Sequence, residues 1–370
     1  MQLLTNTCWR GYEKALKRSP KKVIGLVKES GLRGRSGSNY PTGQKWESMG
    51  KGERYLVCNA DEGEPGTFKD RFIMENNPSL LIEGMAIAAY AMGIRRAWIY
   101  LRGEYSYIRP KLEAEIKKSS SRLKKIGLRI TVVLGAGAYL CGEESAILES
   151  MEGNRPIVRR KPPYPVQAGL NGRPTCVNNV ETLATIPLIL DGTWNPELTV
   201  VCLSGDLQAP GVYEAKLGTP LGEIIAMGKP KEEPKAVYFG ASAGCLPYKN
   251  FRKMPFDEKS FSGTGAMMGS RALIVVGQNR SIPEVSKIFA EFFVHESCGY
   301  CTPCREGNFR VLEALRKMRD KKSCRSDLKI IQALVPDIRD TSYCTLGRFS
   351  TTHLECALRY FKKEFLEVCR

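Results

Sequence analysis

The stretch from Ser297 to Cys304 constrains this chain more than any other, because it places three cysteines at C-x2-C-x2-C spacing. A thiolate at every third residue allows one tight turn to direct three sulfurs toward one point. That arrangement suits three corners of an iron–sulfur cube, which requires four soft anionic ligands. Structural zinc is the alternative, but zinc sites usually combine two C-x2-C pairs or include histidines, and this chain has only two histidines. The spacing therefore predicts a cubane cluster held by Cys298, Cys301 and Cys304.

A fourth ligand must come from outside the triplet. Our candidate is Cys344, which gives the pattern C-x2-C-x2-C-x39-C. Cys324 and Cys356 also lie downstream of the triplet. The spacing favours Cys344 but leaves the other two open.

Cysteine usage and hydropathy indicate where such a chain works. The 13 cysteines are scattered, odd in number and unaccompanied by a secretion signal. We therefore expect a reducing compartment, with free thiols beside a metal centre rather than a disulfide scaffold. No apolar run reaches the roughly 18 residues that a membrane-spanning helix needs.

The formal net charge of +17 raises the question of nucleic-acid binding. The basic residues are spread along the chain, and no recognised nucleic-acid motif accompanies them. We expect no nucleic-acid partner. Bound anionic cofactors or an acidic partner subunit would offset part of the charge.

The first half of the chain alternates strand and helix patterns. We expect strands over 55–58, 97–101 and 128–134, and helices over 13–30, 78–92 and 105–125, with a further helix from the segment 135–144 to about residue 151. Such alternation is typical of an α/β fold with a parallel sheet. The segment 178–182 is interpreted as a simple helix N-terminus.

The pattern changes after residue 196. Short apolar segments at 198–204 and 272–276, a turn at 209–211 and a short helix over 221–227 suggest a small β-grasp-like module. From residue 282 the pattern is helical, over 285–294, 308–318, 327–334 and 350–368. We therefore divide the chain into domains at 1–195, 196–276 and 277–370, the last being a helical bundle that carries the cysteine triplet.

The loop 31–43 combines glycines with cations. Glycine stands at 31, 34, 37 and 43, with Arg33 and Arg35 inside the loop and Lys45 just beyond it. Glycines let backbone N–H groups approach a phosphate, and cations neutralise its charge. The loop matches neither a Walker A motif nor a G-x-G-x-x-G fingerprint, so a plain surface loop is the alternative.

Polar clusters follow two of the apolar segments. Asn59, Asp61 and Glu64 follow a strand, where α/β folds bind their ligands, but a solvated acidic turn would look the same. Glu143 and Glu144 would be favoured in the first turn of any helix. The neighbouring Tyr139 is interpreted as a stacking or core aromatic.

Six segments occur in a characteristic order. They are 31–35, 41–46, 58–66, 135–144, 178–182 and 296–307. Together they resemble the NADH-binding flavoprotein subunit of respiratory complex I and its soluble relatives, the diaphorase subunits of NAD-linked hydrogenases and formate dehydrogenases. The resemblance extends from about residue 13 to about residue 365 and implies a Rossmann-like FMN domain, a β-grasp (SLBB) domain and a helical bundle with one [4Fe–4S] cluster.

The resemblance also implies roles for individual residues. Those that would cradle the FMN phosphate and ring are Gly34, Arg35, Gly37 and Lys45. Those that would fix the flavin are Asn59, Asp61, Asn178, Asn179 and Thr182. Those that would line the nicotinamide dinucleotide side are Glu64, Tyr139, Gly142, Glu143 and Glu144, with Glu64 as the catalytic residue that positions the dinucleotide and tunes the flavin. The cluster ligands would be Cys298, Cys301, Cys304 and Cys344.

The implied activity is NADH:acceptor oxidoreduction. NADH delivers hydride to FMN, and single electrons pass through the cluster to partner subunits, a thioredoxin-like [2Fe–2S] subunit and a larger iron–sulfur subunit of a complex I-type enzyme. Such a subunit is peripheral to a membrane complex on its cytoplasmic or matrix side. The alternatives are the flavin subunit of a soluble, possibly electron-bifurcating, hydrogenase or formate dehydrogenase, and a non-catalytic structural paralogue.

One loop departs from the family pattern. Residues 34–40 read Gly-Arg-Ser-Gly-Ser-Asn-Tyr where relatives usually have Gly-Arg-Gly-Gly-Ala-Gly-Phe, and Ser48 replaces a frequent aromatic residue. Larger or polar side chains there would crowd a ligand that glycine lets approach closely. We therefore expect weaker NADH binding, or a shifted preference between NADH and NADPH.

Overall fold

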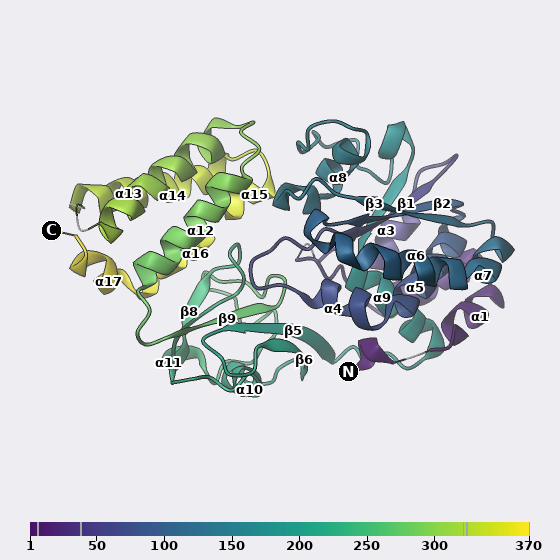
Figure 1. Ribbon diagram of the computed structural model, residues 1–370, viewed down its shortest axis with the longest axis horizontal. Helices are drawn as coiled ribbons and strands as arrows, with labels where there is room; N and C mark the ends of the chain where they lie inside the picture. Colours follow the sequence, from purple (N-terminus) through teal and green to yellow (C-terminus); the bar gives the residue numbers. More distant parts are fainter. Residues whose placement is uncertain (6, 38, 321, 323–324, 370) are drawn as a thin grey trace. The chain divides into compact units, whose positions relative to one another are not determined.

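The computed structural model describes residues 1–5, 7–37, 39–320, 322 and 325–369 (Figure 1). The chain divides into two compact units. The first comprises Met1–Gly63 and Phe68–Glu197, and the second comprises Glu64–Thr67 and Leu198–Arg370. The division of the second part into 196–276 and 277–370 stays a prediction.

The first unit is built on a parallel sheet. Its strands are β1 (Tyr55–Ala60), β2 (Arg96–Leu101), β3 (Arg129–Leu134) and β4 (Thr175–Asn179), in the order β3-β2-β1-β4. This order is that of a Rossmann-like doubly wound sheet, in which the topological switch point lies between β1 and β4. The three strands expected from sequence are confirmed. Strand β4 was missed, because five residues ending in two asparagines resemble the start of a helix.

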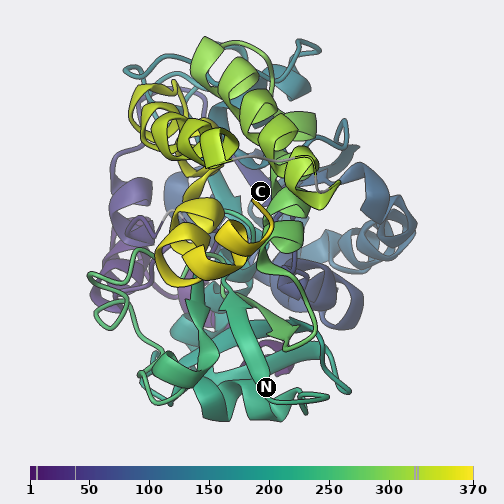
Figure 2. The same cartoon turned by 90° about the vertical axis from the view of Figure 1, so that its left-hand side faces the viewer.

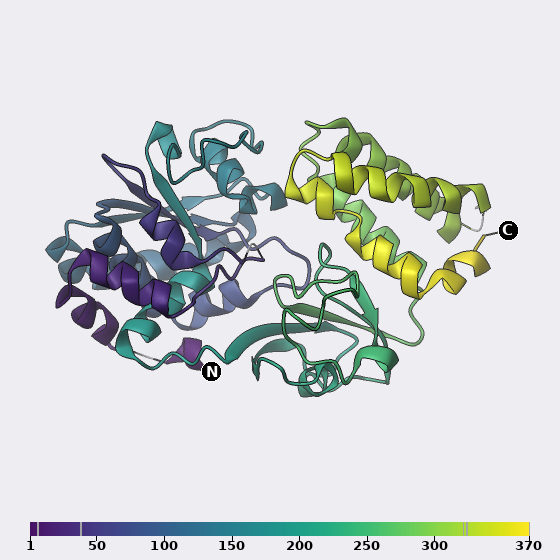
Figure 3. The same ribbon diagram turned by 180° about the vertical axis from the view of Figure 1, so that it is seen from behind.

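Helices cover this sheet. The apolar helices α5 (Pro78–Met92) and α9 (Val180–Asp191) contact each other and β1, as Figure 1 and the reverse view in Figure 3 show. Both are buried on nearly every side, which explains their continuous hydrophobicity. The contact is close because Gly84 lies against the backbone of Leu183.

The predictions of single long helices over 13–30 and 105–125 are wrong, because each range contains two or more shorter helices. The range 13–30 contains α1 (Arg10–Leu16) and α2 (Pro20–Glu29), because Ser19 caps the second helix and proline occupies its first position. The range 105–125 contains η2 (Gly103–Ile108), α6 (Arg109–Lys118) and α7 (Ser120–Lys125). The remaining helices of this unit include α3 (Thr42–Glu47), α4 (Lys69–Asn76), η3 (Tyr139–Gly142) and α8 (Glu144–Met151).

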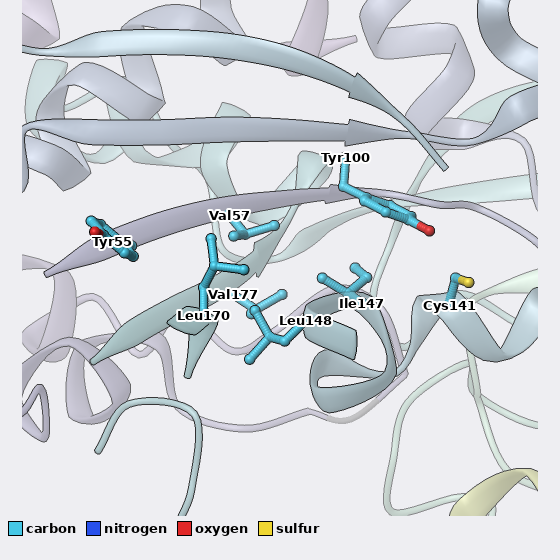
Figure 4. Close-up of a cluster of buried hydrophobic side chains, with 8 residues drawn as sticks. All are labelled: Tyr55, Val57, Tyr100, Cys141, Ile147, Leu148, Leu170 and Val177. Atoms are coloured by element: carbon cyan, nitrogen blue, oxygen red, sulfur yellow. The ribbon is translucent and has the colours of Figure 1, made fainter. Parts of the chain in front are cut away.

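A hydrophobic cluster attaches α8 to the sheet (Figure 4). Ile147 and Leu148 of α8 are fully buried and pack with Val57 of β1 and Val177 of β4. The cluster also contains Tyr55, Tyr100, Cys141 and Leu170. This packing fixes the N-terminus of α8, where Glu143 and Glu144 lie.

The second unit contains a mixed sheet, whose strands are drawn in teal to green in Figure 2. The strands are β5 (Leu198–Gly205), β6 (Gly211–Lys216), β7 (Pro234–Tyr238), β8 (Cys245–Pro247) and β9 (Ala272–Gly277), in the order β6-β5-β9-β7-β8. The short helices α10 (Leu221–Met227) and α11 (Tyr248–Phe251) belong to the same region. The sequence indicated the apolar segments of β5 and β9, the turn before β6 and the helix α10, but nothing at β7 or β8.

The remainder of this unit is helical. It contains α12 (Ile282–Glu296), η5 (Pro303–Gly307), α13 (Asn308–Arg319), α14 (Arg325–Thr341), α15 (Thr345–Phe349), α16 (Thr352–Tyr360) and α17 (Lys362–Glu367). Helix α13 contacts both α12 and α14 (Figure 1). The single helix expected over 350–368 is wrong, since α16 and α17 divide that range. Within the described residues, no helix has both the length and the apolar character of a membrane span.

Candidate functional site

Polar residues meet at the carboxyl edge of the first sheet, beside its switch point. Asn59 of β1 pairs in register with Asn179 of β4, and Cys58 pairs with Asn178. Ligands of doubly wound folds bind in the crevice outside this edge. The structure therefore brings together, at the expected binding edge, strand-end residues that lie far apart in the sequence.

The segment 139–144 is attached to the same edge. Asn59 Nδ2 donates to the Gly142 carbonyl oxygen at 2.8 Å, while Asn59 Oδ1 accepts from the Asp61 amide at 3.0 Å. A Cβ at Gly142 would lie 3.4 Å from the Asp61 carbonyl oxygen, so these backbones are close. Tyr139 is half-buried, and a Cβ at Gly63 would lie 3.1 Å from its Cδ2. Its ring therefore lies over the strand-end turn.

The glycine-rich loop also joins this edge. It folds back on itself, with the Gly34 amide donating to the Tyr40 carbonyl oxygen at 2.8 Å. The Arg35 amide donates to Thr182 Oγ1 at 3.0 Å, which connects the loop to the first turn of α9. Gly37 has a φ of 98°, a backbone conformation that favours glycine. Position 38 of the altered loop lies outside the described residues.

Helix α3 follows the loop and presents a second cation. Trp46 Nε1 donates to Asn178 Oδ1 at 2.9 Å, which holds α3 against β4. On the same helix, Lys45 Nζ lies 2.7 Å from Glu144 Oε2. The glycine at 43 serves packing rather than a ligand, because a Cβ there would lie 2.5 Å from Lys28 Cα.

A lysine that sequence reasoning missed completes a cluster of charges. Lys161 Nζ lies 2.8 Å from Glu143 Oε1 and 3.1 Å from Glu144 Oε1. Burial raises the pKa of Glu144, but the ammonium groups of Lys45 and Lys161 outweigh burial and leave that pKa below its usual value. Both expected acids are thus held by cations. The available signal was a lysine in a proline-rich loop, which we had counted among the scattered basic residues.

Glu143 has a further role at the start of α8. Its Oε2 accepts from the amides of Ser145 at 2.8 Å and Ala146 at 2.9 Å, so it is the N-cap of this helix. The alternative that these acids only favour a helix start is therefore correct in part, since Glu143 stabilises its own helix. The same side chain also faces Lys161, so capping and ion pairing orient it together.

The first unit offers groups that fit a flavin phosphate. Arg35 is only 8% exposed, and its Nε has no hydrogen-bond partner among the described residues. The hydroxyl of Thr42, at the start of α3, is buried and likewise lacks a partner within the described part of the chain. Buried polar atoms that lack a hydrogen-bond partner are costly unless a ligand satisfies them. Their place beside the switch point suits the phosphate of FMN.

Glu64, the expected catalytic residue, belongs to the second unit. Its Oε1 accepts from the Ala241 amide at 2.8 Å, the Ser242 amide at 2.9 Å and Ser242 Oγ at 2.9 Å. Gly240 has a φ of 71°, and a Cβ there would lie 2.5 Å from this oxygen. The carboxylate therefore anchors the loop 240–242. Its role toward a dinucleotide stays a prediction.

The second unit brings four cysteines together. Cys298 and Cys301 follow α12, Cys304 lies in η5, and Cys344 is the N-cap of α15. Burial, together with the neighbouring thiols of Cys301, Cys344 and Cys298, raises the pKa of Cys304 to about 11. Burial, with a contribution from the thiols of Cys298 and Cys301, also raises the pKa of Cys344. The fold thus places the candidate fourth ligand beside the triplet.

Cys356 and Cys324 were the alternatives to Cys344 as the fourth ligand. Cys356 is in α16, where its thiol faces Gly244 and interacts with Cys245. Cys324 lies outside the described residues. Within those residues, no three Cys, His, Asp or Glu side chains converge as the ligands of one metal ion do. A cube of four irons is wider than a single ion, because each cysteine binds a different iron.

Hydrogen bonds and close packing support the cysteine site. Ser297 Oγ lies 3.4 Å from Cys304 Sγ, and Asn308 Nδ2 lies 3.5 Å from the same sulfur. A Cβ at Gly347 would lie 3.1 Å from Cys304 Cβ, so α15 packs directly on the cysteine turn. A set of four cysteine thiols, with hydrogen-bonding groups close to one of the sulfurs, fits an iron–sulfur cluster.

Comparison with known proteins finds matches over the two regions that contain these residues. The sequence model described as the Nuo51 FMN-binding domain matches residues 27–188, and that of the NADH-ubiquinone oxidoreductase-F iron-sulfur binding region matches residues 284–368. The second F-type subunit of the NADH-quinone oxidoreductase of Rhizobium meliloti is 40% identical over 97% of this chain and 91% of its own length. The corresponding F-type subunit of Aquifex aeolicus is 41% identical over 96% of this chain and 88% of its own length.

A solved structure shows the same fold. The match is to the H2-reduced NAD+-reducing [NiFe]-hydrogenase, with a TM-score of 0.93 and 35% sequence identity. It covers 99% of this chain and 66% of the hydrogenase chain. The chain belongs to the family of F-type subunits of NADH-quinone oxidoreductases, which join an FMN-binding domain to an iron–sulfur binding region.

Proposed function

We propose that this chain is the NADH-oxidising flavoprotein subunit of a complex I-type NADH:quinone oxidoreductase. The observation that carries the proposal is the convergence of Arg35, Lys45, Asn59 and Asn178 at the switch point of a parallel sheet. Four neighbouring cysteines in the second unit supply a second redox site. A flavin that accepts two electrons, combined with a one-electron carrier, is what oxidation of NADH by a one-electron chain requires.

In this proposal the protein contributes placement and polarity. When bound, FMN supplies hydride acceptance from NADH, and the [4Fe–4S] cluster supplies one-electron transfer. Arg35 and Lys45 would neutralise the phosphate, while Asn59, Asp61, Asn178, Asn179 and Thr182 order the strand edge at which the flavin would bind. No side chain is required as a general acid or base.

The acidic pair orients the dinucleotide side. Lys45 and Lys161 hold Glu144, and Lys161 also holds Glu143. Because α8 is fixed to the sheet by its hydrophobic cluster, both carboxylates are preorganised. Preorganised carboxylates can accept hydrogen bonds from ribose hydroxyls without further ordering.

The partners follow from this role. Electrons that leave the cluster require an acceptor, and we assign this to a thioredoxin-like [2Fe–2S] subunit and a larger iron–sulfur subunit. The whole would be peripheral to a membrane complex on its cytoplasmic or matrix side. Anaerobic purification with identification of the accompanying subunits tests this assignment.

The structural match to the NAD+-reducing hydrogenase favours a second candidate, the diaphorase subunit of a soluble hydrogenase. The same purification separates the two. Quinone-oxidoreductase subunits would support the first candidate, and hydrogenase subunits would support the second.

Acid extraction of the purified chain is expected to release FMN and not FAD, because the sequence offers one glycine-rich cationic loop as a phosphate cradle and no second fingerprint for an adenylate half. The bound flavin should bleach when NADH is added under anaerobic conditions. Recovery of FAD would refute the cofactor assignment. Bound FMN that neither NADH nor NADPH reduces would instead indicate a non-catalytic paralogue.

Glu64→Gln is expected to slow flavin reduction by NADH while the flavin stays bound. A charge-assisted hydrogen bond to the dinucleotide is worth roughly 1.5–3 kcal/mol, which corresponds to about 10- to 150-fold in rate or affinity. Stopped-flow reduction at several NADH concentrations measures the effect. Ser242→Ala is the matched control, because it removes one hydrogen bond to Glu64 but keeps the carboxylate. Equal kinetics in Glu64→Gln and the unmutated chain would leave Glu64 as a loop anchor only.

A further inference from the structure

A buried ionic network lies behind the glycine-rich loop of the first unit. Its members, each at most 8% exposed, are Arg35, Glu62, Lys69, Asp70 and Glu181. They come from the loop, the turn after β1, the first turn of α4 and the first turn of α9. Sequence reasoning assigned a role only to Arg35.

Lys69 lies at the centre of this network. Its Nζ is 2.7 Å from Asp70 Oδ1 and 3.0 Å from Glu181 Oε2. The other carboxylate oxygen of Glu181 lies 3.8 Å from Arg35 Nε. Glu181 therefore stands between two cations, one of which faces the proposed phosphate site.

The acidic end of the network is also held by hydrogen bonds. Asp70 Oδ2 accepts from Asn179 Nδ2 at 2.5 Å. The two oxygens of Glu62 accept from the amides of Asp70 at 2.8 Å and Arg71 at 3.0 Å. These bonds join the strand-end turn to α4 and to β4, so the network is continuous from Glu62 to Arg35.

We propose that Lys69 is a positioning residue for the flavin phosphate, because it offsets the charge of Glu181, the carboxylate that faces Arg35. The inference rests on the proposed FMN binding and extends it to a residue that need not touch the flavin. Without Lys69, the Glu181 carboxylate would cancel the charge of Arg35 and repel the phosphate. Arg35 is prepared for such a ligand, since its Nε has no hydrogen-bond partner among the described residues.

The charge balance supports this role. Three carboxylates face two cations, so the network carries one excess negative charge when every group is ionised. Burial, followed by the charge of Asp70, raises the pKa of Glu62 to about 8. Burial also raises the pKa of Asp70, so this pair of carboxylates holds one proton at neutral pH, and the network is then neutral. The carboxylates of Asp70 and Glu181 outweigh burial and raise the pKa of Lys69, which keeps its charge.

This balance makes phosphate binding depend on pH. The charged and titratable groups that surround Glu62 are Lys69, Asp70 and Arg71 of α4, Arg102 after β2, and Tyr105 of η2. As pH rises through about 8, Glu62 loses its proton and the network becomes negative. FMN affinity should therefore fall above neutral pH, while a flavin without phosphate should be unaffected.

Fluorescence titration of the deflavinated full chain with FMN and with riboflavin tests the proposal. Lys69→Met is expected to weaken FMN binding by roughly 10- to 100-fold, from the loss of one buried charge near a phosphate. Riboflavin binding should change little, because riboflavin lacks the phosphate. Lys69→Arg should retain FMN affinity, and Lys69→Met with Glu181→Gln should recover most of it, since one charge of each sign is then removed.

Glu62→Gln gives an independent measurement if Lys69→Met does not fold. In the unmutated chain FMN should bind more weakly at pH 9 than at pH 7, and Glu62→Gln should abolish this difference. Equal FMN affinity in Lys69→Met, equal losses for FMN and riboflavin, or FMN binding that does not change with pH would each overturn the role of Lys69. An unmutated chain that does not bind FMN would instead overturn the proposed function, and this inference with it.

Discussion

Cys344→Ala is expected to lose the iron–sulfur cluster or convert it to a smaller one. The unmutated chain should contain about four irons and about four acid-labile sulfides, as one cubane cluster requires. Removal of Cys344 leaves one iron without a protein ligand at the start of α15, where no other cysteine of the described residues shares its contact with the triplet. Iron and sulfide analysis after anaerobic purification, together with the visible spectrum, measures the loss.

Cys356→Ala and Cys324→Ala are the matched controls. Cys356 interacts with Cys245 and packs against Gly244, so its removal should leave the cluster content unchanged. Cys324 lies outside the described residues, and the same result is expected from the spacing. Loss of the cluster in Cys324→Ala with retention in Cys344→Ala would show that the fourth ligand is Cys324.

Gly84→Ala is expected to destabilise the first unit by about 3 kcal/mol or more, because overpacking against rigid backbone costs roughly 1–3 kcal/mol and occasionally more. A Cβ at Gly84 of α5 would overlap the carbonyl oxygen of Leu183 and lie 2.7 Å from its carbonyl carbon. Both atoms belong to the backbone of α9, so neither can rotate away. A lower apparent melting temperature, followed by flavin release on heating, would show this loss.

Gly25→Ala is the opposite case on another helix. The nearest atom to a Cβ there is Glu29 Oε1 at 3.9 Å, so the methyl group makes only an ordinary van der Waals contact. Alanine in a helix interior is favoured over glycine by about 0.8–1 kcal/mol. The melting temperature should therefore stay equal or rise. A similar fall in both variants would mean that the α5–α9 contact is not the cause of the Gly84 effect.

Elements with a strong local pattern were predictable. The apolar run of α5 and the three strands β1, β2 and β3 follow from the hydrophobic pattern, because α5 and β1 are apolar along most of their length and β3 alternates buried with exposed residues. Strand β4 was not predictable in this way. Its last residues, Asn178 and Asn179, owe their strand conformation to pairing with β1. Short strands of this kind form through partners that lie far away in sequence.

The same distinction between local pattern and tertiary contact applies to the candidate site. The cysteine triplet and the order of the six segments determined the family and the chemistry, since they depend only on residue type and spacing along the chain. The tertiary structure decided that Cys344, rather than Cys356, lies beside the triplet. It also decided that Lys161 holds Glu143 and Glu144, and that Lys69 lies between Asp70 and Glu181. Ion pairs between segments that lie apart in the sequence have no local signature, because the two partners come together only when the chain has folded.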